Sequence, residues 1–333
     1  MARATLKDVA AAAGVSVSTA SRALAGNPAI APATRDRVRA CAADLDYQPN
    51  AQARALRSSR TNIIGLTVPS LVNPFFATMA HVIQQEASRH GLSTIISSTA
   101  EDPAQLATSL GTLASQQVDG ILAVPYNGSD DAFTRLPMPV VLVDRELPDA
   151  GLPTIASDPR PGIDAAVAHL LERGHHHIGY LSGPMTTSTG VGRLAAFEEA
   201  CGRHGVDKRE IYHGGFDRAE GHQGTLDLLD RGVEAIIAGD SMMSVGALEA
   251  CHARQVAIGR DLALIGFDDN STMRLQASPV TVIDQNVADL GTRALHLLID
   301  LMSGTSPPPA PTTPTTLIIR PSSDFTRRRH HRD

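Results

Sequence analysis

Apolar residues in the first fifty positions recur every three or four residues, in three short segments. The first runs from Thr5 to Gly14, with a threonine suited to a helix N-cap and a glycine suited to a helix stop. The second runs from Ser16 to about Leu24, and the third from Pro32 to about Leu45. Two short helices joined by a tight turn, followed by a supporting third helix, predict an all-α helix-turn-helix head.

A different pattern begins at about Thr61, where short runs rich in β-branched residues alternate with stretches of helical period. Helical periodicity covers residues 75–91 and 245–254, among others. Strands that alternate with helices of about 10–15 residues predict an α/β core of doubly wound parallel sheets. The strand-like runs are, in chain order, IIGLTVP, STIISST, GILAVP, VVLVDR, HIGYLSG, AIIAGD, LALIGFDD and LIIRP.

Composition and charge narrow the class of protein. The 333 residues are 42% hydrophobic without a long apolar run, and the first ten lack the apolar core of a signal peptide, so we expect a cytoplasmic protein with no membrane segment. The three cysteines are far apart and are expected to be ordinary thiols. Residues 1–60 carry nine Lys and Arg against four Asp and Glu, whereas the rest carries 20 against 31. A basic head on an acidic body is typical of a nucleic-acid-binding domain attached to a larger core.

The second predicted helix is rich in small hydroxylic residues, which are mediocre in helix interiors. A helix that enters a DNA major groove needs such outward side chains, because they are small or form hydrogen bonds. Thr19 and Ser21 suit phosphates, Val17 suits a thymine methyl, Ser18 suits either base edge, and Arg22 suits guanine. A helix of small residues packed against a neighbour is the alternative, and we favour DNA recognition because cap, turn, arginine and charge agree.

The segments TLKDVAAAAGVSVSTASRAL and TRDRVRACAADLDYQPNAQARAL resemble the N-terminus of LacI/GalR-type bacterial transcription regulators. The resemblance implies a homodimer on a pseudopalindromic operator, with residues 48–60 forming a hinge helix that inserts Leu56 into the minor groove. An apolar residue among arginines fits that role, because base steps give it a burial partner. One departure is Ala31, where the family usually has a capping serine. The residues expected to contact DNA are Thr5, Ser16, Val17, Ser18, Thr19, Ser21, Arg22, Asn50, Arg54, Leu56 and Arg57.

Polar and aromatic side chains follow several of the strand-like runs in the body. In open α/β sheets ligands bind outside the carboxyl ends of the strands, so we expect these side chains to surround a cleft. Carboxylates, guanidinium groups and aromatic rings together suit a ligand rich in hydroxyl groups. The set consists of Asn73, Phe75, Phe76, Asp144, Arg145, Arg193, Asp240, Asp268 and Gln285.

The body also resembles the sugar-binding core of the same family, which is akin to periplasmic sugar-binding proteins. The resemblance to ribose-binding members implies a pentose effector, ribose first, or a ribosyl nucleoside, with Gln223 in place of an asparagine. It also implies two subdomains, with chain crossings near Asp158, Gln285 and Arg320. The expected layout is a head at 1–47, a hinge at 48–60 and a core at 61–333. Within the core, we expect the N-subdomain to span 61–157 and 286–319 and the C-subdomain to span 158–285 and 320–326. The tail at 327–333 is expected to be disordered.

Two other motifs are weighed and set aside. GVGRLA at 190–195 fits a dinucleotide pattern, but eight residues separate it from the preceding strand. The run His175-His176-His177 has no second ligand cluster at suitable spacing. We therefore expect no cofactor, no metal site and no enzymatic activity. A periplasmic-type sugar carrier and an NAD-dependent enzyme stay open as alternatives to a DNA-binding repressor.

Overall fold

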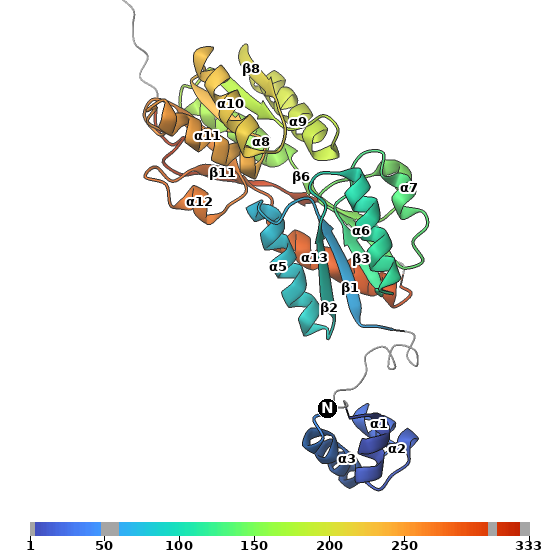
Figure 1. Cartoon of the computed structure of the whole chain (residues 1–333). Coiled ribbons are helices and arrows are strands. Elements are labelled where there is room, and N and C mark those ends of the chain that lie inside the picture. The colour runs from blue at the N-terminus through green and yellow to red at the C-terminus, as the bar shows by residue number, and fades with distance from the viewer. Residues whose placement is uncertain (1–3, 48–59, 306–311, 327–333) are drawn as a thin grey trace, which may run out of the picture. The chain divides into compact units, whose positions relative to one another are not determined.

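The computed structural model describes residues 4–47, 60–305 and 312–326. The chain divides into two compact units, Met1–Thr61 and Asn62–Asp333 (Figure 1). None of the helices in these described ranges is long and apolar enough to cross a membrane.

The first unit is a three-helix head. Its helices are α1 (Leu6–Ala12), α2 (Val17–Leu24) and α3 (Pro32–Asp44). Gly14 ends the turn after α1 with a φ of +62°, a backbone conformation that favours glycine. Val9, Ala20 and Val38, one from each helix, lie in the buried core of the head. The three predicted helices are confirmed to within two residues at each end.

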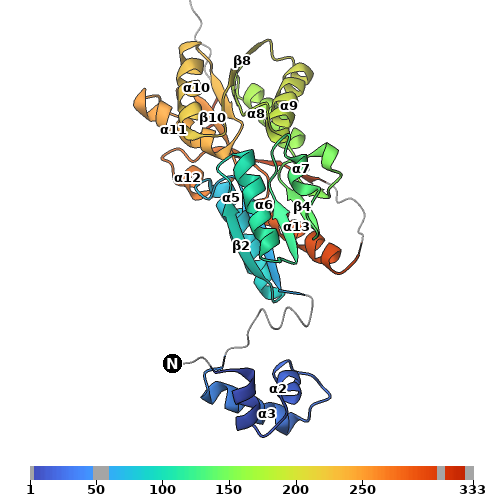
Figure 2. The same ribbon diagram turned by 45° about the vertical axis from the view of Figure 1, so that its right-hand side comes forward.

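The second unit contains two subdomains, each built on a twisted sheet between helices (Figures 1 and 2). The first sheet is parallel and has the order β2-β1-β3-β4-β5. Its strands are β1 (Ile63–Val68), β2 (Ser93–Ser98), β3 (Gly120–Ala123), β4 (Val140–Val143) and β5 (Thr154–Ile155). Its helices are α5 (Pro74–Arg89), α6 (Pro103–Ser115), α7 (Asp130–Phe133), the 3-10 helix η1 (Pro148–Ala150) and α13 (Val287–Met302).

Alternate residues of the first sheet pack against opposite helical layers. Leu122 and Val141 face the cluster formed with α5 and α13, whereas Ile121 and Leu142 face the cluster formed with α6. All four side chains are buried. A parallel sheet covered on both faces needs such continuous apolar strands, which explains why GILAVP and VVLVDR were recognisable in the sequence.

The second sheet has the order β13-β11-β10-β9-β7-β8, and only β13 runs antiparallel to its neighbour. Its strands are β7 (His177–Ser182), β8 (Lys208–His213), β9 (Ala235–Ala238), β10 (Ala263–Phe267), β11 (Thr281–Asp284) and β13 (Thr316–Ile318). The helices are α8 (Arg160–Glu172), α9 (Ser188–His204), α10 (Arg218–Asp230), α11 (Ser241–Ala253) and α12 (Ser271–Arg274). Helices α8 and α9 cover one face, and α10 and α11 cover the other.

Three segments connect the subdomains, and two of them pair with each other. Strand β6 (Ser157–Asp158) runs parallel to β12 (Thr313–Pro314). The other connection runs from β11 to α13 past Gln285. The crossing through β12 ends before β13, because residues 316–318 already pair with β11 of the second sheet. The expected crossing near Arg320 was therefore wrong by several residues: the isoleucine-rich run that was assigned to the N-subdomain is an edge strand of the other sheet.

Candidate functional site

Helix α2 presents a polar surface on the head. The Ser16 hydroxyl caps the helix by accepting a hydrogen bond from the Thr19 backbone N–H at 3.1 Å. It also lies 3.0 Å from the Ser18 hydroxyl and 2.8 Å from the Thr19 hydroxyl. Val17, Ser18 and Arg22 are exposed, whereas Thr19 and Ser21 are half-buried. The helix thus buries its alanine face and leaves a face of one apolar, one hydroxylic and one cationic side chain for a partner.

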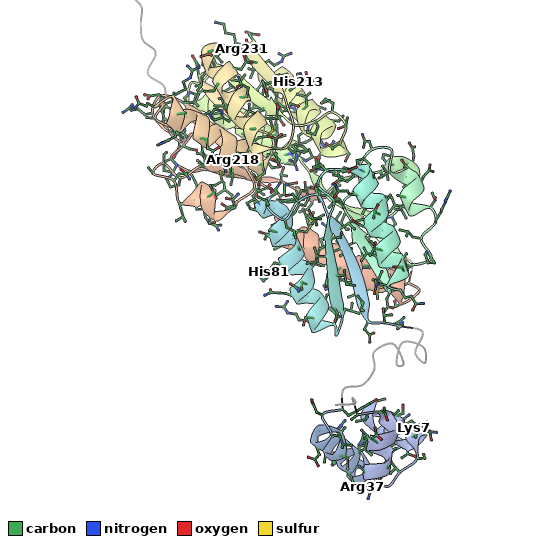
Figure 3. The ribbon with its side chains drawn as sticks, viewed as in Figure 1. Lys7, Arg37, His81, His213, Arg218 and Arg231 are labelled. Carbon is green, nitrogen blue, oxygen red and sulfur yellow. The ribbon has the colours of Figure 1, made fainter. Side chains whose placement is uncertain are left out.

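The other described residue that was expected to contact DNA is Thr5, at the start of α1. Thr5 begins α1, and both its backbone N–H and its hydroxyl donate to the Asp8 carboxylate at 2.8 Å. These hydrogen bonds hold the pKa of Asp8 below its usual value. Lys7 and Arg37 are exposed on the head (Figure 3). The other expected DNA contacts lie outside the described residues, namely Asn50, Arg54, Leu56 and Arg57.

The second unit contains a small cavity between its subdomains. Nine of the ten residues that the sequence placed around an effector line it. They come from the carboxyl ends of strands in both sheets and from the start of α5 and α9, as expected for open α/β folds. The lining residues are Asn73, Phe75, Phe76, Asp144, Arg145, Thr189, Arg193, Phe216, Asp240, Asp268 and Gln285.

Gln223 is the exception, and its assignment to the effector site is corrected. It is exposed on α10, whose buried face is formed by Gly221, Gly224, Thr225 and Leu228. Positions three and four apart share one face of a helix, so residue 223 points away from that face. The loop before α10 supplies Phe216 to the cavity in its place.

Sequence reasoning missed three residues that shape the cavity. The Phe216 ring lies 5.8 Å from the Arg145 guanidinium and 5.7 Å from that of Arg193. A side chain at Gly183 would collide with this ring, so that glycine makes room for it. Thr189, in the first turn of α9, and Glu101, just after β2, also follow strand ends. Their position after a predicted strand could have identified Thr189 and Glu101. The strand before Phe216 is charged and was not recognised, so Phe216 had no such signal.

Asp144 and Arg145 form the centre of the cavity on the N-subdomain side. Both are buried, and Asp144 adopts a φ of +68°, which is uncommon for a residue other than glycine. The Arg145 guanidinium makes two hydrogen bonds to Glu101, at 2.8 and 2.9 Å. The Asp144 carboxylate lies 3.9 Å from both Arg145 Nε and Arg193 Nη2, which is too far for hydrogen bonds. Asp144 Oδ1 and Arg145 Nε consequently have no hydrogen-bond partner among the described residues.

Arg193 reaches the cavity from α9 of the C-subdomain. It donates to the Gly239 carbonyl at 2.8 Å and to Gln285 Oε1 at 3.0 Å, and it stacks 4.2 Å from the centre of the Phe267 ring. Gln285 also accepts a hydrogen bond from Ser157, in the segment that connects the subdomains. This arginine therefore links the acidic cavity to a segment that connects the two subdomains.

The two carboxylates of the C-subdomain are held by protein donors. Asp240 caps α11 by accepting from the Met242 and Met243 backbone N–H groups. Asp268 accepts from the Ser241 hydroxyl at 2.8 Å and the Gln285 amide at 2.7 Å. Burial raises the pKa of both, that of Asp268 to about 7, although Arg193 opposes the shift.

The pKa of Asp144 is raised as well, because its burial outweighs the attraction of Arg193 and Arg145. The cavity thus combines three carboxylates, whose charged form burial disfavours, with two guanidinium groups and three phenylalanine rings. Such a site favours a neutral ligand with many hydroxyl groups and apolar ring faces.

The motifs set aside in the sequence have structural positions. Gly190 to Ala195 lie inside α9, not in a turn between strand and helix. His175 is buried with its ring 5.0 Å from that of Phe325. The GVGRLA motif therefore does not form a phosphate loop. The three consecutive histidines do not gather around one point.

A helix-turn-helix head and a cleft-bearing core define a ligand-responsive DNA-binding regulator. The family model described as bacterial regulatory proteins, lacI family, matches residues 5–50, and that of a periplasmic binding protein-like domain matches residues 167–323. Taken with the similarities described next, these matches show that the chain belongs to the LacI family of bacterial transcriptional repressors.

Three curated relatives are transcriptional repressors of similar length. The repressor PurR of Mannheimia succiniciproducens is 32% identical over 305 residues, covering 89% of this chain and 91% of the relative. The repressor CytR of Escherichia coli K12 is 32% identical over 309 residues, covering 90% of each. The ribose operon repressor of the same strain is 29% identical over 304 residues, covering 89% and 92%.

Two solved structures show the same architecture. A LacI family regulator from Corynebacterium glutamicum is 45% identical, with a TM-score of 0.72 over 78% of this chain and 98% of the other. The lac repressor dimer bound to operator and the anti-inducer ONPF is 26% identical, with a TM-score of 0.85 over 97% and 99%. The predicted fold, a helical head and a two-subdomain α/β core, is confirmed.

Proposed function

We propose that this repressor binds a pseudopalindromic operator as a homodimer and that a pentose, ribose first, controls its operator affinity from the cavity. The observation that carries the effector proposal is a pair of buried polar atoms, Asp144 Oδ1 and Arg145 Nε, for which the described residues provide no hydrogen-bond partner. A sugar hydroxyl donates one hydrogen bond and accepts others, so it can bridge a carboxylate and a guanidinium that lie 3.9 Å apart.

The aromatic lining supports a sugar ring. Phe75 and Phe76 lie edge-to-face with ring centres 5.1 Å apart, and Phe216 lies in the same lining. These rings suit the apolar C–H faces of a sugar, while the buried polar groups would reject an analogue that lacks a hydroxyl. The similarity to a ribose operon repressor supports the same ligand class.

The tightness of the cavity favours a free pentose over a ribosyl nucleoside. Either ligand requires the subdomains to separate, because the lining side chains leave little free space between them, and the smaller pentose requires less separation. A nucleoside remains the second candidate, because the ribose-facing contacts would be shared and the base would require the subdomains to separate further.

Isothermal titration calorimetry tests the effector. The wild-type protein should bind ribose, and Asp144→Ala should lose over 2 kcal/mol of binding free energy, because it leaves buried ligand hydroxyls unpaired. Asp261→Ala, an exposed carboxylate far along the chain, is the matched control and should bind as the wild type does. Binding of a hexose or a purine base, with no response to any pentose or nucleoside, would contradict the assignment.

The DNA-reading role of α2 has its own test. Arg22→Ala should relax base preference at one operator position, at a cost of about 1–3 kcal/mol, because it removes a bidentate base contact. Arg37→Ala, which removes an exposed arginine on α3, should weaken binding to all sequences alike. A site selection that returns the same altered motif for both variants would contradict this division of roles.

A further inference from the structure

Helices α5 and α13 pack side by side on one face of the first sheet. Both helices begin beside the cavity, at Phe75 and just after Gln285, and both run away from it. Gly291 allows the close approach, since a side chain there would lie 3.3 Å from Val82 and 3.4 Å from Ile83. Further along both helices, His296 of α13 meets Glu86 of α5. The two helices therefore run in the same direction, and the residues after this contact are brought to one exposed end of the pair.

Three side chains with metal-ligating atoms meet at that end. Glu86 Oε1 lies 3.2 Å from His296 Nε2 and 3.4 Å from His90 Nε2. All three ligand atoms lie within 4.8 Å of one another. The two imidazole rings are nearly perpendicular, with centres 5.6 Å apart. Glu86 and His90 are one helical turn apart on α5, whereas His296 is more than two hundred residues away, so spacing along the chain does not predict the group.

The spacing of these atoms is that of ligands around one metal ion. With metal–nitrogen and metal–oxygen distances of about 2.0–2.2 Å in a tetrahedral site, neighbouring ligand atoms lie roughly 3.4 Å apart. The two distances to Glu86 Oε1 match this value. From this geometry we propose that Glu86, His90 and His296 bind a divalent transition metal ion of the zinc type, which joins α5 to α13.

The remaining contacts of Glu86 are compatible with such a site. Its other oxygen, Oε2, accepts a hydrogen bond from Arg89 at 2.6 Å, which orients the carboxylate. Imidazole nitrogens select zinc, nickel or copper over magnesium and calcium.

This site is distinct from the proposed effector cavity and adds a second ligand class to the protein. Metal binding there should stabilise the N-subdomain, because an ion bound only by the folded state shifts the unfolding equilibrium. The coordination uses three protein ligands and leaves a fourth position for water.

Calorimetric titration of the chelator-treated full-length protein with ZnCl₂ tests the proposal. We expect one zinc equivalent whose affinity falls at least tenfold in His296→Ala and in Glu86→Gln, because each loses one of three ligands. His81→Ala is the matched control: His81 is exposed on α5 outside the cluster (Figure 3) and should leave zinc binding unchanged. Magnesium should show no heat of binding at this site.

Thermal unfolding separates metal binding from folding. With EDTA the wild type and His296→Ala should melt together, because the histidine is half-exposed on the surface. Zinc should raise the melting temperature of the wild type and of His81→Ala, but not that of His296→Ala. Equal zinc binding and an equal thermal shift in all variants would overturn the proposal and assign the zinc to the histidines elsewhere in the chain.

Discussion

The two subdomains have the same strand order, and each has an aspartate after the equivalent strand, but the two aspartates have different hydrogen bonds. Their sheets follow the same order, β2-β1-β3-β4-β5 in the first and β8-β7-β9-β10-β11 in the second. Asp144 follows β4 and Asp268 follows β10, the equivalent strand, and both have left-handed backbones with φ of +68° and +63°. Both side chains are buried against the same cavity.

Their hydrogen bonds distinguish them. Asp268 accepts hydrogen bonds from Ser241 and Gln285. Asp144 has one oxygen without a partner in the described part of the chain, and two arginines lie 3.9 Å from its carboxylate. Buried polar groups are normally paired, and exceptions concentrate at functional sites. The hydrogen bonds of Asp268 stabilise the architecture of the cleft, and the unpaired oxygen of Asp144 supports its proposed role in binding the effector.

The largest expected effect on stability comes from removing Arg193, whose positive charge opposes the raised pKa of both aspartates. Arg193→Ala should lower the free energy of unfolding by about 3 kcal/mol, because it leaves buried carboxylates beside Gln285 without their positive neighbour. Urea denaturation measures this loss. Arg260→Ala, which breaks an exposed pair with Asp261, should leave the free energy of unfolding almost unchanged. Equal stability of the two variants would show that the cavity charges are not coupled to folding.

The pH dependence of stability sharpens the contrast at Asp268. Burial raises its pKa to about 7, whereas an unfolded aspartate titrates near 4. Between these values the native state holds a proton that the unfolded state has lost, so the contribution of this group to stability falls as pH rises from 4 to 7. Asp268→Asn resembles the protonated acid and should escape that fall.

Thermal unfolding across pH 4 to 8 measures the difference. The variant should match the wild type near pH 4 and exceed it above pH 7, by on the order of 2 kcal/mol. A stability difference that stays constant across this range would mean that Asp268 does not titrate there in the folded protein.

The smallest expected effect concerns Glu101, which lies at the rim of the cavity and accepts two hydrogen bonds from Arg145. Its carboxylate is 43% exposed, so the pair contributes only modestly to any binding equilibrium. Glu101→Gln should weaken ribose binding by about 0.5–1 kcal/mol, because Arg145 loses the bidentate contact that orients its Nε. Calorimetry that shows unchanged or tighter binding would assign Glu101 no positioning role.

The head was predictable from the sequence because its signals are local. Thr5, Ser16 and Pro32 mark helix starts through chemistry that acts within three or four residues. The structure also shows the consequence of Ala31, which precedes α3 without a side-chain cap. No comparable long-range information was needed to place these three helices.

The core was predictable where strands are buried on both faces and unpredictable at its edges. Strand β8 was missed because Lys208, Arg209 and Glu210 give it a charged, exposed start, as edge strands often have. With β8 unrecognised, Phe216 was missed. Gln223 had been assigned from the resemblance alone, in place of an asparagine, and the structure contradicts that assignment. The cavity's hydrogen-bond pattern and the zinc-ligand cluster depend on contacts between distant segments, which spacing along the chain does not encode.

Operator binding with and without ribose tests the central claim most directly, since the head and the cleft must act on one equilibrium. Fluorescence anisotropy with a selected pseudopalindromic operator gives the affinity of the full-length protein. Saturating ribose should change that affinity at least fivefold in the wild type, the lower end of usual allosteric coupling, and should leave Asp144→Ala unaffected. Ribose that binds the protein by calorimetry but changes operator affinity in neither protein, or equally in both, would contradict the account.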